Sequence, residues 1–268
     1  AEASRVLIRD GRPAATIVVG STHPERARAA AEELNQHLRR AAGVGLPVVE
    51  ETEAGEIPDG QTVVVVGGGA LATALGVPQQ PLEIEEFVVR TQGRHVVFVG
   101  SDTAGVEDPD ERRQSPATLW AVDYFLDRHM GVRWLWPGAV GMFVPKADAV
   151  TVPDLDVRQR PAMVVRDLRR ILWSSHVSRA RISNLDVVER VAGEADQWYA
   201  RHQMGRREKL AAGHSFRHWW EKYHEQHPDI FATLPEGMTQ PNPVPDRVKL
   251  CVSNPLVAEL ALKEWREA

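Results

Sequence analysis

Cysteine is nearly absent from this chain, whose 268 residues include a single one, Cys251. One thiol excludes an internal disulfide framework and any zinc module built from several cysteines. Long hydrophobic runs are absent too: the longest, residues 62–66, is strand-sized and far below the roughly 20 residues that span a bilayer. An excess of positive charge is also missing, and the formal net charge of −5 argues against a nucleic-acid-binding protein.

What remains is ordinary globular composition, with 43% hydrophobic and 26% charged residues, which excludes a wholly disordered chain. The length allows one large domain or two modest ones. The first residue is Ala1 rather than Met, which fits either removal of a signal peptide or an artificial start of the chain. We expect an extracytoplasmic or secreted protein.

The first part of the chain alternates strand-like and helix-like patterns. Apolar residues at three- and four-residue spacing predict a helix over residues 27–38, with Ser21 or Thr22 as its N-cap and Gly43 as its stop. A second helix is predicted over residues 119–126. Strands are expected at residues 16–20, 46–49 and 62–66, a hairpin at 87–90 and 95–99, and extended pieces at 132–138 and 142–145. The β-branched run at 62–66 is expected to be covered on both faces.

Residues 148–161 contain two prolines and no helical pattern, and we place the domain boundary there, giving domains 1–155 and 156–268. The second domain is expected to hold strands at 162–166 and 248–252 and helices at 185–205, 214–227 and 255–265. Such alternation predicts parallel β/α units. An eight-unit barrel needs roughly 250 residues, so this region corresponds only to the opening of one. The predicted fold class is α/β.

Residues 67–72, Gly-Gly-Gly-Ala-Leu-Ala, follow a predicted strand and match the dinucleotide-binding pattern G-x-G-x-x-A. The alternative is a glycine-rich turn, because the motif follows the third strand and Gly76 and Pro78 come too early for the usual helix. The acids at a distance suited to a ribose are Glu83, Glu85 and Glu86.

Four histidines lie between residues 214 and 227, and His214 and His218 have the spacing of a zinc pair on a helix. The alternative is capping and surface histidines, because no nearby cysteine completes a ligand set. Ser215 lacks the second glycine of a nucleophile elbow. Cys251 fits a buried structural thiol better than a nucleophile paired with a remote histidine. We therefore expect neither a metal nor a cofactor.

Tryptophan is unusually frequent, with eight residues against three tyrosines. Indole faces stack on the apolar faces of sugar rings, but they also pack in cores and domain interfaces, which we expect for at least half of them.

Several segments resemble known sugar-cleaving enzymes. Residues 16–47, 93–102 and 117–126 resemble the N-terminal α+β accessory domain of α-glucuronidases and β-hexosaminidases. Residues 131–138, Gly-Val-Arg-Trp-Leu-Trp-Pro-Gly, resemble the bacterial domain-of-unknown-function family 4838, which includes glycoside hydrolase family 163. The match continues through residues 198–201, 213–216, 227–231 and 250–255. The resemblance implies an accessory domain followed by a TIM-type glycosidase barrel.

The resemblance also implies a saccharide-binding site. Arg166 matches an arginine at the end of the first barrel strand that binds sugar hydroxyls in β-hexosaminidases, although an ion pair with Asp167 or another acid of this chain is an equal alternative. His214 and Asn254 would face the barrel mouth, and Trp173 or Trp219 would stack on a sugar.

Glycoside hydrolysis usually needs two carboxyl groups, and in related barrels the acids lie on later strands, beyond residue 268. Asp167 and Asp229 do not match them, so we expect no catalytic residue in this chain. The resemblance implies part of a hydrolase of a complex glycan, such as one containing N-acetylglucosamine. The alternative is a non-catalytic carbohydrate-binding or scaffolding protein with a partial barrel.

Overall fold

The computed structural model describes residues 5–53, 57–102, 116–166, 185–206, 216, 218–232 and 249–267. The chain divides into two compact units, residues 1–208 and 209–268. The mixed helices and parallel and antiparallel strands confirm the α/β class predicted from the sequence.

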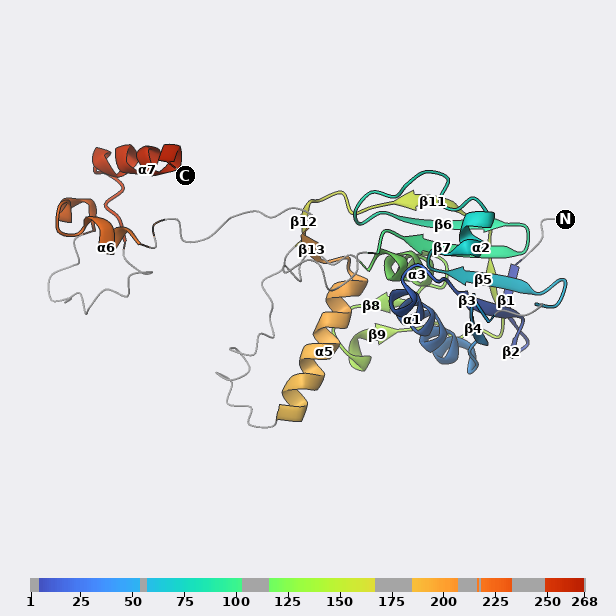
Figure 1. Ribbon diagram of the computed structural model, residues 1–268. Helices are drawn as coiled ribbons and strands as arrows, with labels where there is room; N and C mark the ends of the chain where they lie inside the picture. The colour runs from blue at the N-terminus through green and yellow to red at the C-terminus, as the bar shows by residue number, and fades with distance from the viewer. Residues whose placement is uncertain are drawn as a thin grey trace. The chain divides into compact units, whose positions relative to one another are not determined.

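A six-stranded sheet forms the centre of the first unit (Figure 1). Neighbouring strands β4, β3, β5 and β7 run parallel, whereas β6 pairs antiparallel with β7 and β11 pairs antiparallel with β6. The strands, in spatial order, are β11 (Asp156–Gln159), β6 (Phe87–Gln92), β7 (His95–Gly100), β5 (Thr62–Val66), β3 (Ala15–Val19) and β4 (Val48–Glu50).

Helices cover both faces of this sheet. On one face, α1 (Pro24–Ala42) and α3 (Ala117–Arg128) pack on Ile17, Val64 and Phe98. On the other face, the short α2 (Ala70–Ala74) packs on Val63, Val65 and Val97. Since alternate side chains of a strand point to opposite faces, these two sets explain why β5 is buried at every position, as its run of β-branched residues predicted.

The ends of α1 agree only partly with the sequence prediction. Gly43 ends the helix in a left-handed conformation with φ of 81°, and its N–H donates to the carbonyl of Arg39. The predicted N-cap was wrong, because the cap position is His23 and makes no side-chain capping bond. Ser21 instead donates its hydroxyl to the carboxylate of Glu51, 2.7 Å away.

A second, three-stranded sheet has the order β10 (Val150–Val152), β1 (Arg5–Arg9) and β2 (Arg12–Pro13). The predicted boundary segment, residues 148–161, therefore contributes β10 to this sheet and β11 to the large one.

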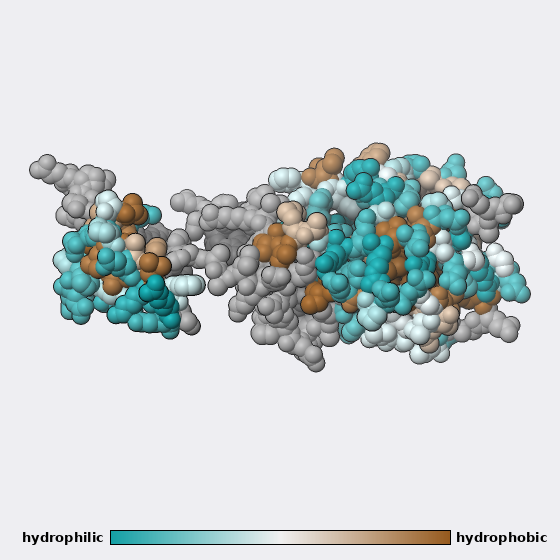
Figure 2. Space-filling model, turned by 90° about the horizontal axis from the view of Figure 1, so that it is seen from above, coloured by the Kyte–Doolittle hydropathy of each residue, from teal (hydrophilic) through white to brown (hydrophobic). Residues whose placement is uncertain are grey.

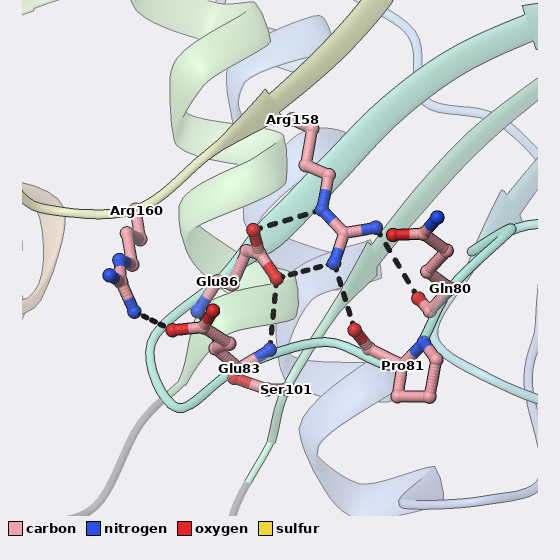
Figure 3. A network of polar contacts seen from close by, with 7 residues as sticks. All are labelled: Gln80, Pro81, Glu83, Glu86, Ser101, Arg158 and Arg160. Atoms are coloured by element: carbon pink, nitrogen blue, oxygen red, sulfur yellow. Dashed lines mark hydrogen bonds and ion pairs between the residues drawn. The ribbon is translucent and has the colours of Figure 1, made fainter.

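Close contacts fix β11 at the edge of the large sheet (Figure 3). Arg158 donates Nε and Nη2 to the carboxylate of Glu86 at 2.9 and 2.8 Å, and Nη2 also reaches the carbonyl of Pro81. Arg160 pairs with Glu83, whose backbone N–H donates to Glu86. The segment that follows β11 is thereby tied to the loop that precedes β6.

The first unit also contains two short hairpins and one long helix. These are β8 (Arg133–Trp134) with β9 (Met142–Phe143), β12 (Val165–Arg166) with β13 (Gly205–Arg206), and α5 (Leu185–Arg201); a single 3-10 turn, η2 (Ala139–Gly141), lies between β8 and β9. The helix predicted over residues 185–205 is thus confirmed over most of its length.

The second unit is small and has a core of four aromatic and aliphatic side chains. Its elements are α6 (Trp219–Tyr223), η3 (Pro228–Ile230) and α7 (Pro255–Glu267), with one isolated bridge between Phe231 and Leu250. The helix predicted over 214–227 is shorter in its described part, and the described residues of the predicted strand 248–252 show only that bridge. The division into domains 1–155 and 156–268 and the barrel opening stay predictions.

The side of the chain visible in Figure 2 is mainly hydrophilic, with hydrophobic residues in separate patches. Within the ranges that the structure describes, no helix has the length and apolar character needed to cross a bilayer.

Candidate functional site

Arg166, the predicted sugar-binding residue at the end of β12, is buried in a pocket of acceptors from its own chain. Its Nη2 donates to the carboxylate of Glu85 at 2.6 Å, its Nε to the carbonyl of Gln203 at 2.5 Å and its Nη1 to the carbonyl of Met163 at 2.6 Å. The guanidinium also lies 5.9 Å from the ring centroid of Trp120. The side chains of Arg166 and Glu85 are only 6% and 4% exposed.

Both longer-range partners of Arg166 have unusual backbone conformations. Glu85 has φ of 66° and Gln203 has φ of 54°, in the left-handed region that costs energy for residues other than glycine. The surrounding contacts must hold these conformations, and Arg166 supplies a hydrogen bond to each residue. Arg166 therefore links the β12–β13 hairpin to the loop before β6. This ion pair with Glu85 corresponds to the alternative that the sequence analysis gave beside sugar binding, a pair with an acid of the same chain.

A second buried polar group joins α1, α3 and α5. Arg201 forms a bidentate pair with Glu33 at 2.7 and 3.0 Å, and its guanidinium lies 5.5 Å from the ring centroid of Trp134. The indole N–H of Trp134 donates to Nε2 of His37 at 3.1 Å, so the proton of that imidazole is on Nδ1, which faces the carbonyl of Glu33 at 2.8 Å. Burial lowers the pKa of His37, which agrees with the neutral form.

Asp123 lies beside this group on α3, and both of its carboxyl oxygens are buried without a hydrogen-bond partner in the structure. Burial raises the pKa of Asp123 well above its ordinary value, and the nearby charge of Glu33 raises it further, whereas Arg201 lowers it. Its surroundings therefore favour the neutral form of the Asp123 carboxyl group.

The glycine-rich segment considered for a dinucleotide forms the turn between β5 and α2. The position at the start of α2 where a pyrophosphate would bind holds the carboxylate of Glu51 instead. This carboxylate accepts hydrogen bonds from the N–H of Leu71 at 2.5 Å and from the hydroxyl of Ser21. A Cβ at Gly69 would collide with the same carboxylate. Burial raises the pKa of Glu51, but these hydrogen bonds outweigh it and the pKa is lowered.

The three acids considered for the ribose of a dinucleotide each hold an arginine instead. Glu83 binds Arg160, Glu86 binds Arg158 and Glu85 binds Arg166 (Figure 3 shows the first two pairs). The glycine-rich turn is thus explained as a structural turn, the alternative that the sequence had left open.

In the second unit, Trp219 is 3% exposed and its indole N–H donates to the carboxylate of Glu264 at 2.7 Å. Lys222 and the hydroxyl of Tyr223 bind the same carboxylate. Burial raises the pKa of Glu264, but the hydrogen bonds from Lys222, Trp219 and Tyr223 lower it overall. Trp219 therefore packs in the core of the second unit, which was the alternative to stacking on a sugar.

Asn254 begins the last helix. Its side-chain oxygen accepts the N–H of Leu256 at 3.0 Å, and its amide nitrogen donates to the carboxylate of Asp229 at 2.7 Å. The bond to Leu256 makes Asn254 the N-terminal cap of α7. A role of Asn254 in binding a sugar stays a prediction.

Trp173, His214 and Ser215 lie outside the described residues. His218 is exposed near Glu221, and in the described part of the chain no three His, Cys, Asp or Glu side chains come together as metal ligands would. The thiol of Cys251 is partly exposed rather than buried, and its contact with the hydroxyl of Ser253 lowers its pKa.

The sequence did not indicate Glu85 as the partner of Arg166, although Glu85 was considered as a ribose-binding acid. Nor did the sequence indicate the exposed apolar surface of the β8–β9 hairpin, where Leu135, Trp136, Val140 and Phe143 are 57–100% exposed. A signal was present for two of them, because Leu135 and Trp136 belong to the motif at residues 131–138 that carried the family resemblance.

Comparison with solved structures finds a fold similar to "A novel family GH115 4-O-Methyl-alpha-glucuronidase, BtGH115A, with specificity for decorated arabinogalactans". The TM-score is 0.51 at 16% sequence identity, over 74% of this chain and 25% of that protein. The chain therefore spans about a quarter of the length of that structure, and the likeness concerns the fold alone. No curated protein sequence matches the chain.

The family model described as "Domain of unknown function (DUF4838)" matches residues 136–268. This match confirms the family resemblance that the sequence indicated. This chain is therefore similar to the DUF4838 family over residues 136–268.

Proposed function

We propose that this chain is the leading part of a glycoside hydrolase that acts on a complex glycan, such as one containing N-acetylglucosamine. The observation that carries this proposal is the combination of the two comparisons. The DUF4838 match covers residues 136–268, and the fold likeness to an enzyme titled as an α-glucuronidase covers 74% of the chain.

In this proposal the catalytic carboxyl groups belong to later barrel strands, downstream of residue 268, and the described residues bind rather than cleave. The internal pairing of the acids supports this division of roles. Glu33, Glu85 and Glu86 each hold an arginine, so none of them is an unpaired general acid. Of the sugar contacts expected from the sequence, Trp173, His214 and Asn254 remain proposals. Arg166 and Trp219 would reach a sugar only if their buried contacts with Glu85 and Glu264 opened.

The second candidate is a non-catalytic carbohydrate-binding or scaffolding protein secreted from the cell. It is favoured by the same pairing of acids and by the two tryptophans with exposed rings, Trp136 and Trp265, at 57% and 77% exposure. An indole ring that faces solvent offers an apolar face to a sugar at no cost in core packing.

One pair of measurements on the 268-residue chain tests the proposal. Binding is measured on an array of complex glycans, and sugar release is measured on the same glycans. We expect binding without release. Binding with release would place catalytic acids inside the chain, and an array without any bound glycan would refute a glycan-related role altogether.

A further inference from the structure

The β8–β9 hairpin has one face packed inward and one face exposed. Trp134 lies opposite Met142 in the strand register, and this pair packs on the main core. Arg133 lies opposite Phe143, so this pair occupies the other face. The Phe143 residue is 58% exposed and the Arg133 side chain is 51% exposed, which places an aromatic ring and a guanidinium side by side in solvent.

The backbone that presents this face is fixed by its own contacts. The N–H of Leu135 donates to the carbonyl of Gly141 at 2.7 Å, which closes the turn. A Cβ at Gly141 would collide with the backbone of Trp136, and Gly138 has φ of 79°, so both glycines are required by the turn. Leu135, which is 74% exposed, therefore lies in a turn whose backbone is held by a hydrogen bond and by two glycines.

Arg133 is held by one end of its guanidinium. Its Nη1 donates to the carbonyl and the carboxylate of Asp127, both at 2.8 Å, and to the carbonyl of Val132 at 2.7 Å. Its Nε and Nη2 make no hydrogen bond to any described residue. These two nitrogens form the edge of a guanidinium that binds a carboxylate through two parallel hydrogen bonds.

We propose that the platform formed by Arg133, Leu135 and Phe143 binds an acidic saccharide. The apolar face of a sugar ring lies on Phe143 and Leu135, and the sugar carboxylate binds Nε and Nη2 of Arg133. This inference rests on the proposed glycan-related function and adds to it a second site, on the first unit, with a stated substrate chemistry.

Two other occupants fit these observations less well. A stable dimer buries roughly 20–30 residues on each partner, whereas the hairpin exposes four large apolar side chains, Leu135, Trp136, Val140 and Phe143. An anionic lipid surface is attracted by clusters of several basic residues. Here the platform contains one basic residue, Arg133, which is not such a cluster.

The test compares an oligosaccharide that contains glucuronic acid with its carboxyl-reduced, neutral counterpart, by calorimetry on the 268-residue chain. The wild type should bind the acidic form at least tenfold more tightly. Arg133→Gln should remove that preference, whereas Arg28→Gln, a matched control with a side chain 54% exposed, should retain it. Phe143→Ala should weaken binding of both forms, and Leu262→Ala, at a matched apolar residue of the second unit that is 53% exposed, should not.

Thermal unfolding of each variant checks that the fold is kept. The unfolding temperature should stay close to that of the wild type, because more than half of each of the four substituted residues is exposed to solvent. Equal binding of the acidic and neutral forms, or an unchanged preference in Arg133→Gln, would overturn the platform while leaving a glycan-related role intact. Binding of phosphatidylserine vesicles that is lost in Phe143→Ala would overturn it in favour of a lipid surface. A chain that binds no glycan of any kind would refute both this platform and the proposed function.

Discussion

Replacing Arg166 by Met should destabilise the first compact unit by about 3–5 kcal/mol, the cost of breaking a buried ion pair from one side. The two side chains of the pair are 6% and 4% exposed, so the carboxylate of Glu85 would be left in a site that water does not reach. The carbonyls of Gln203 and Met163 would each lose a donor as well. The double variant Arg166→Met with Glu85→Leu removes both charges, so neither is left buried alone. Its decrease in the free energy of unfolding should be smaller than the sum of the two single decreases by about 2 kcal/mol or more, the order of the coupling energy seen in buried pairs.

The measurement is urea unfolding at pH 7, followed by circular dichroism. Hydrogen exchange at β6 and α3 assigns the change to the first unit. Arg28→Met serves as the control, because Arg28 pairs with Glu50 in an exposed position, and its unfolding midpoint should stay close to that of the wild type. A loss below about 1 kcal/mol in Arg166→Met, accompanied by loss of glycan binding, would refute a structural role for this arginine and favour a sugar contact.

Three further predictions concern single residues. Glu51→Gln should lower the free energy of unfolding by about 1–2 kcal/mol at pH 7, measured by urea unfolding, because the turn before α2 loses a charged acceptor. The pKa of Glu51 is lowered in the folded state, so its contribution is present above the unfolded pKa and disappears as the pH falls through the folded pKa. A difference between variant and wild type that persists at low pH would contradict this reasoning. Gly100→Ala should cost about 2–3 kcal/mol, because a Cβ there would collide with the backbone of Ala117, whereas Gly11→Ala meets open space and tests only the strain of a positive φ; equal losses would show that the collision is relieved. Asp123→Asn should raise the free energy of unfolding more at pH 8 than at pH 5. The pKa of Asp123 is raised in the folded state, so the wild-type protein loses stability as the pH rises above the unfolded pKa, whereas the variant does not. A constant difference between pH 5 and pH 8 would mean that Asp123 is ionised in the folded state.

Much of the sheet could be predicted because its signals are local. The β-branched run of β5 indicated a strand buried on both faces, and the apolar spacing of residues 27–38 indicated α1, which the structure confirms. Gly93, with φ of 54°, lies in the turn that joins β6 and β7, where the hairpin pattern placed it.

The buried pairs could not be predicted, because their partners are far apart in the chain. Arg166 and Glu85 are separated by 81 positions, and Arg201 and Glu33 by 168. No periodicity or motif connects such residues, and their charges suggest exposure rather than burial. The N-cap of α1 failed for a related reason, since Ser21 was drawn to Glu51, a residue 30 positions away.

The position of β11 has a practical consequence for cutting the chain into pieces. A fragment that stops at residue 155 loses this strand and leaves β6, with Phe87, Val88 and Val89, as a bare apolar edge ready to pair with another molecule. Extending the fragment past Arg160 keeps a charged outer strand in place, together with the arginine contacts that hold it. The same few residues that join one region to the next thus also protect the sheet from self-association.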